Sequence, residues 1–151
     1  MQNGFGALGF YVLAVSAGVS FVFQQAVNAN LRSEIGSPFW AGFVSYLGGT
    51  LAMLVMVIVL REPWPSAGAV LRSSWLSWTG GVFGAVYIAI SILLLPRLGA
   101  ATVVALIVLG QMLASLAFDH SGALGVPHHP VSLVRLLGAA LMVVSVVMIR
   151  T

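Results

Sequence analysis

Five long apolar segments account for most of this chain and leave few ways for it to fold. They cover about residues 5–27, 38–60, 74–95, 100–118 and 130–149. Each is close to the roughly 20 residues that a helix needs to cross a bilayer. The chain is 60% hydrophobic and 6% charged, whereas a soluble domain has about 25% charged residues. We therefore predict an all-α membrane protein with a single transmembrane domain over residues 1–151 and five transmembrane helices.

Polar or glycine- and proline-rich stretches separate these segments. We expect turns or loops at about residues 28–37, 61–73, 96–99 and 119–129. The second helix has a clear start, because Ser37 can cap it and Pro38 suits the first helical position. The first segment is too long for the apolar region of a signal peptide and has no arginine before it, so we expect it to remain as a helix.

The basic residues are divided equally between the two sides of the membrane. All six are arginines. Five crossings place one set beside the N-terminus and the other beside the C-terminus: Arg61, Arg72 and Arg135 against Arg32, Arg97 and Arg150. Orientation normally follows an excess of Lys and Arg on the cytoplasmic side. The balance predicts dual topology, in which two antiparallel copies form an inverted repeat. Chance in a chain with few charges, or orientation by a partner, is the alternative.

Polar side chains within apolar helices are expensive in lipid and are therefore candidates for a binding site. Ser16, Ser20, Gln24 and Asn28 recur at every fourth position of the first segment. We predict that the substrate contacts are Gln24, Asn28, Tyr87, Gln111 and Ser115. The alternative for the amides is hydrogen bonding between helices, and for Tyr87 it is core packing. Gly80 and Gly84 fit a small-residue packing seam.

Several kinds of chemistry are disfavoured. No Asp, Glu or Lys lies in the middle of a segment, which favours a neutral, zwitterionic or anionic solute over an organic cation. We expect no enzyme activity, catalytic residue or cofactor, because no acid–base pair or activated nucleophile lies at membrane depth. No regular spacing relates the three histidines near Asp119, so no metal site is expected. The net charge of +3 is dispersed, which argues against nucleic acid as a partner. Asp119 and Arg135 flank one loop, so an ion pair between them is plausible, and extension of the Arg135 side chain to the membrane interface is the alternative.

Together these features resemble the half-size, five-helix YdcZ-like family of the drug/metabolite transporter (DMT) superfamily. The matching residues are Gln24 to Leu31, Gly36-Ser37-Pro38, Gly80-Gly81 with Gly84 and Tyr87, Pro96 to Ala101, Gly110-Gln111, and Asp119 to Gly122. The resemblance implies a ten-helix bundle of two inverted halves around a central cavity. Small multidrug exporters of the same superfamily have a glutamate within the first helix, which this chain lacks.

The sequence thus predicts a secondary transporter that works by alternating access as an antiparallel homodimer. Its partners would be a second copy of itself, a small-molecule substrate and the lipid bilayer, with the bacterial inner membrane as its location. Two alternatives stay open: a non-transporting membrane subunit, and one half of a heterodimer with an oppositely oriented paralogue.

Overall fold

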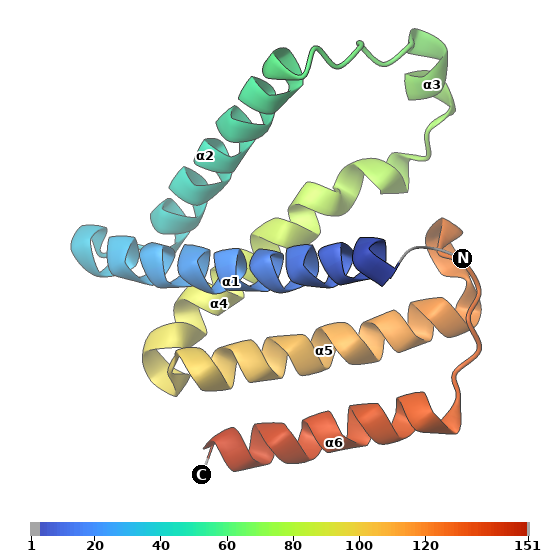
Figure 1. The fold of residues 1–151 in the computed structure, drawn as a ribbon. Coiled ribbons are helices and arrows are strands. Elements are labelled where there is room, and N and C mark those ends of the chain that lie inside the picture. Colours follow the sequence, from blue (N-terminus) through green and yellow to red (C-terminus); the bar gives the residue numbers. More distant parts are fainter. Residues whose placement is uncertain (1–3, 151) are drawn as a thin grey trace. The chain divides into compact units, whose positions relative to one another are not determined.

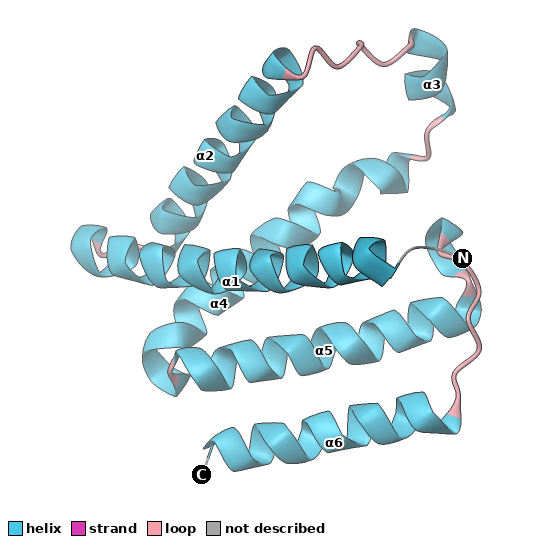
Figure 2. Ribbon diagram, in the orientation of Figure 1, coloured by secondary structure: helices cyan, strands magenta, loops and turns pink. Residues whose placement is uncertain are grey.

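The computed structural model describes residues 4–150, with side chains from residue 8 onward. These residues form helices and loops (Figures 1 and 2). The α-helices are α1 (Gly4–Ile35), α2 (Pro38–Val59), α3 (Ala67–Arg72), α4 (Gly80–Leu98), α5 (Ala100–Ser121) and α6 (Leu133–Arg150). Two short 3-10 helices, η1 (Trp75–Thr79) and η2 (Ala123–Gly125), precede α4 and follow α5. The chain divides into a first unit ending at Pro96 and a second beginning at Arg97.

Five of these helical stretches are long and apolar enough to cross a membrane. They are Leu8–Ile35, Pro38–Val59, Trp75–Leu98, Ala100–Ser121 and Leu133–Arg150. Most of their large apolar side chains are exposed. Exposure on this scale suits a solvent of lipid tails, in which apolar surface needs no cover. The prediction of an all-α protein with five helices of membrane-spanning length is confirmed.

Helix α1 is longer than the sequence pattern predicted. Residues 28–35, expected to form a turn, continue the helix to Ile35. The Asn30 side-chain amide donates to the Glu34 carboxylate at 2.8 Å, one helical turn later. The helix ends at Gly36, which has a φ of +74° and donates its N–H to the Arg32 carbonyl at 2.9 Å. The polar residues of this segment mark the end of the apolar stretch. They do not end the helix, because polar side chains are compatible with a helix outside the lipid tails.

The start of α2 agrees with the prediction, but the turn before α5 does not. Ser37 Oγ accepts a hydrogen bond from the Trp40 N–H at 3.3 Å, and Pro38 is the first helical residue. The hairpin expected at residues 96–99 is reduced to Gly99, with a φ of +77°, because α4 continues through Pro96 to Leu98. Glycine adopts this backbone conformation without the steric cost of a Cβ atom.

Pro96 releases one backbone acceptor inside α4, and α1 supplies the missing donor. Proline has no N–H, so the Ile92 carbonyl four residues earlier has no donor within the helix. The Arg32 guanidinium, in the last turn of α1, donates to that carbonyl at 2.7 Å and to the Leu93 carbonyl at 3.5 Å. Arg32 thereby ties the end of α1 to α4 and satisfies a buried carbonyl that the fold would otherwise leave unpaired.

The core of the first unit lies where α1, α2 and α4 meet. Ala41, Ile88 and Ile92 are its buried apolar residues. A Cβ atom at Gly84 would overlap the Tyr46 hydroxyl oxygen, so only glycine allows Tyr46 to lie this close to α4. The predicted glycine seam is therefore right for Gly84. At Gly80 a Cβ would have no neighbour within 4 Å among the described residues.

The second unit is a pair of helices, α5 and α6, that run antiparallel side by side (Figure 1). Val103, Ala139 and Val146 are the buried apolar residues of these two helices. Helix α5 continues to Ser121, beyond the predicted end at residue 118, and α6 starts at Leu133 instead of residue 130. The predicted pairing is confirmed, because Arg135 Nη1 lies 3.0 Å from Asp119 Oδ2. This ion pair joins the two helices at the ends connected by the loop.

Candidate functional site

Two of the predicted site residues, Gln24 and Asn28, line a polar groove between α1 and α2. The groove has a volume of about 430 Å³. We call it the amide groove; its polar residues are Ser20, Gln24, Asn28 and Ser45, and its apolar residues include Phe23, Val27, Leu31 and Val44. A volume of this order falls in the roughly 300–1,000 Å³ range of small-molecule sites. The predicted pairing of Gln24 with Asn28 at one place on α1 is therefore found in the fold.

Both amides donate to the same hydroxyl group on α2. Asn28 Nδ2 lies 3.1 Å from Ser45 Oγ, and Gln24 Nε2 lies 3.3 Å from it. The side-chain carbonyl oxygens of Gln24 and Asn28 accept no hydrogen bond from any residue in the described part of the chain. An amide carries two N–H donors and an acceptor oxygen, so each keeps hydrogen-bonding capacity for a ligand. Asn28 is only 4% exposed, which fixes its position, whereas Gln24 is exposed at the open side.

Tyr87, on α4, contacts α1 on a different side from the amide groove. Its hydrogen-bond partner there is Gln25, which the sequence analysis did not select as a site residue. Gln25 Nε2 donates to the Tyr87 hydroxyl at 2.8 Å, and Phe21 stacks on the Tyr87 ring with centroids 5.2 Å apart. Gln25 is 3% exposed, and its Oε1 has no hydrogen-bond partner in the described structure. The signal that could have identified Gln25 is its spacing, because residues 21, 25 and 32 recur along one helix face.

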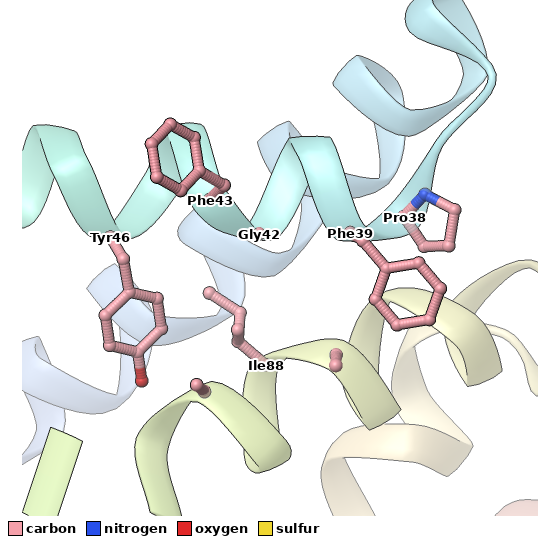
Figure 3. Close-up of a pocket in the computed structure, with 8 residues that line it drawn as sticks. Pro38, Phe39, Gly42, Phe43, Tyr46 and Ile88 are labelled. Atoms are coloured by element: carbon pink, nitrogen blue, oxygen red, sulfur yellow. The ribbon is translucent and has the colours of Figure 1, made fainter. Parts of the chain in front are cut away.

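A second groove in the first unit, between α2 and α4, is apolar. It has a volume of about 290 Å³. In Figure 3, Phe39 and Tyr46 point from α2 toward α4, and Ile88 points between them toward Gly42. A Cβ atom at Gly42 would lie 3.6 Å from Ile88 Cγ2, an ordinary packing distance. Side-chain packing accounts for this groove. A further groove on α1, of about 500 Å³, has Asn30 as its one polar lining residue, so the amide groove is the most polar candidate site of this unit.

The two remaining predicted residues lie in the second unit. Gln111 and Ser115 are four residues apart on α5, so they share a face, and both are exposed. Neither side chain makes a hydrogen bond with the residues whose side chains are described. Gln24 and Asn28 are thus brought together in one unit, and Gln111 and Ser115 in the other. The role of each predicted residue as a substrate contact stays a prediction.

The histidines near Asp119 form no metal-binding group. Among the described residues no three His, Asp or Glu side chains are arranged to hold an ion. His120 and His128 have ring centroids 6.3 Å apart, and His120 Nδ1 accepts from the Val131 N–H at 3.5 Å. The Asp119 carboxylate is bound to Arg135. These contacts hold the α5–α6 loop and do not converge on a common point.

Five helices of membrane-spanning length define an integral membrane protein, and its first unit holds an uncharged polar groove. The model of the family described as "Putative inner membrane exporter, YdcZ" matches residues 9–148, and the chain belongs to this family. The resemblance seen in the sequence is thereby confirmed. No curated protein and no solved structure matches the chain.

Family membership and the five apolar helices establish the location and the general class. The protein is an integral protein of the inner membrane, as predicted. It belongs to a family of membrane exporters, so its class is that of a transporter, which the sequence analysis favoured over an enzyme.

Proposed function

We propose that the protein is a secondary transporter that binds a small neutral or zwitterionic solute in the amide groove. The single observation that carries this proposal is the convergence of Gln24 and Asn28 on Ser45 Oγ in an open groove. The groove offers amide oxygens and N–H groups but no charge. Such a site discriminates well in favour of a solute with hydroxyl or amino donors, because a ligand without them leaves buried polar groups unpaired. An anion would need a basic group brought from elsewhere.

The amide groove also supports an antiparallel homodimer. Polar groups facing lipid tails without partners cost several kcal/mol each, roughly, so an open polar groove needs a cover. A second copy of opposite orientation supplies this cover. It would also turn five helices into an inverted repeat, with the balanced arginines allowing both orientations. Alternating access then follows from exchanging the roles of two identical copies.

Transport by the protein alone is tested with proteoliposomes. The purified protein is reconstituted without any other protein and offered a panel of labelled polyols, zwitterionic amino acids and organic anions. We expect uptake above empty liposomes for a neutral or zwitterionic class, and loss of uptake in Gln111→Ala with dimerisation intact if that residue contributes to the cavity. No uptake across the panel would favour a non-transporting subunit or a heterodimer.

Orientation is tested by thiol labelling, which is clean because the chain has no cysteine. Single thiols are introduced as Ser66→Cys, in the link between α2 and α4, and as Thr151→Cys, an odd number of crossings later. Dual topology predicts that a membrane-impermeant maleimide added to intact cells labels about half of the copies of each variant. Complete labelling of one variant and none of the other would exclude the antiparallel homodimer.

A further inference from the structure

A separate groove, in the unit formed by α5 and α6, has no part in the proposed transport site. It has a volume of about 630 Å³ and is lined by Leu98, Thr102, Leu106, Val146, Val147 and Arg150. Four of these residues are aliphatic. The N-terminal end of α5 lies beside the C-terminal end of α6 (Figure 1), so Thr102 and Arg150 belong to the same end of the groove.

The polar end of this groove is suited to an anion in three ways. Helix α5 begins after Gly99, which gives no side-chain cap, so the N–H groups of its first turn keep their partial positive charge. Thr102 as a residue is 9% exposed and lines the groove, and its hydroxyl makes no hydrogen bond with a described residue. The Arg150 guanidinium makes neither a hydrogen bond nor an ion pair with any residue in the described range.

The Thr102 hydroxyl is the observation that separates this place from an ordinary helix end. A buried hydroxyl in an α-helix usually donates back to a carbonyl of the preceding turn. Ser16, Thr50 and Ser145 all do so here, at 2.9 Å. Thr102 is the most buried of the four residues, but it is the third residue of α5, where the helix has no preceding turn to accept such a bond. Its hydroxyl therefore lines the groove without a protein partner and is available to a ligand.

We propose that this groove binds an anionic phospholipid of the surrounding membrane. One acyl chain lies along Leu106 and Val147, and the phosphate is held by Arg150, the Thr102 hydroxyl and the first turn of α5. Phosphate binding at a helix N-terminus and to arginine follows the general electrostatics of such groups. Helix ends with arginine lie at the depth of the lipid headgroups, where a phosphate is available. This inference does not depend on the proposed function.

The test is native mass spectrometry of the purified protein released from detergent. Equal amounts of phosphatidylglycerol and phosphatidylcholine with identical oleoyl chains are added, and the lipid-bound fractions are compared. Both lipids carry the same phosphodiester, but the quaternary ammonium of phosphatidylcholine is repelled by the Arg150 guanidinium, so we expect phosphatidylglycerol to be preferred by about tenfold. Arg150→Gln should remove the preference, and Thr102→Val, a change of equal size, should lower the bound fraction of both lipids severalfold.

Arg72→Gln is the matched control, because Arg72 also lies in the last turn of a helix but does not line the groove. It should keep the preference. Equal binding of the two lipids, or unchanged binding in both groove variants, would overturn the proposal. Displacement of phosphatidylglycerol by about 10 mM inorganic phosphate would assign the site to a free anion.

A cross-linking experiment tests whether a second copy of the chain occupies the groove. Single thiols at Leu106 and Val147 should not form disulfides between copies if a lipid lies there. Such disulfides, together with absence of bound phosphatidylglycerol, would assign the groove to the dimer interface and reject the lipid site.

Discussion

Asn28→Leu should lower solute flux in proteoliposomes by about tenfold to a hundredfold while leaving the protein folded. Asn28 is the most buried polar residue of the amide groove. Leucine has a similar size but removes the donor to Ser45 and the acceptor oxygen offered to the solute. Loss of a hydrogen-bonding partner to a bound solute costs about 1–3 kcal/mol. Flux is measured with the solute class that the wild-type protein carries.

The matched control is Asn30→Leu, the same substitution on the same helix. Asn30 is exposed, bonds Glu34 and does not line the amide groove. Its flux should stay within about twofold of wild type, since surface changes of this kind cost about 0.5 kcal/mol or less. Equal losses in the two variants, or full flux in Asn28→Leu, would contradict a substrate role for the groove. Thermal unfolding of both variants in detergent separates binding from stability.

Arg32→Met should destabilise the protein by about 2–3 kcal/mol, the cost expected when a charged donor leaves a buried carbonyl unpaired. The carbonyl is that of Ile92, which Pro96 has deprived of its donor within α4. Pro96→Ala returns an N–H to the helix. In the Pro96→Ala background the Arg32→Met substitution should therefore cost less, with a coupling free energy of about 1–2 kcal/mol. Unfolding in mixed detergent micelles measures all four proteins of the cycle.

Arg135→Met serves as the comparison, because it removes an arginine whose partner is a partly exposed carboxylate. The two side chains are 41% and 27% exposed, so loss of the pair should cost about 1 kcal/mol or less. A cost for Arg32→Met as small as that for Arg135→Met would show that the carbonyl finds another donor. Additive effects of Arg32→Met and Pro96→Ala would show that the two residues are independent.

The number of helices of membrane-spanning length could be predicted because it depends on the length of the apolar segments. The short helix α3, in a segment predicted as a loop, and the 3-10 helix η1, at the predicted start of the third helix, were not predicted. The ends of the helices could not be predicted either. Asn30, Arg32 and Glu34 predicted a turn because they are polar, but a helix accommodates polar side chains that find partners, as Asn30 does in Glu34 one turn later. Pro96 reads as a break, yet a proline near the end of a helix loses one hydrogen bond, and here Arg32 replaces it. The donor that replaces the lost N–H is Arg32 of α1, so nothing in the sequence near Pro96 indicates that the hydrogen bond is replaced.

The polar residues of the candidate site could be listed from the sequence, but their arrangement could not be predicted. Gln24 and Gln25 are neighbours in sequence, and their side chains lie about 100° apart around the helix. Which amide faces α2 and which faces α4 is decided by the rotation of α1 about its own axis, and in the fold Phe21 stacks on Tyr87 on the α4 side. Periodicity placed Gln24 with Asn28 correctly and could not show that Tyr87 belongs with Gln25.

The unequal lengths of α1 and α6 have a consequence for the membrane around the protein. At 1.5 Å per residue, the 32 residues of α1 extend about 48 Å and the 18 residues of α6 about 27 Å. A hydrocarbon layer of about 30 Å is shorter than the first helix and slightly longer than the second. Tilting or a polar end among the headgroups accommodates α1, whereas α6 draws the bilayer thinner around itself. A thicker membrane would therefore increase the length mismatch of α6 before it affected α1.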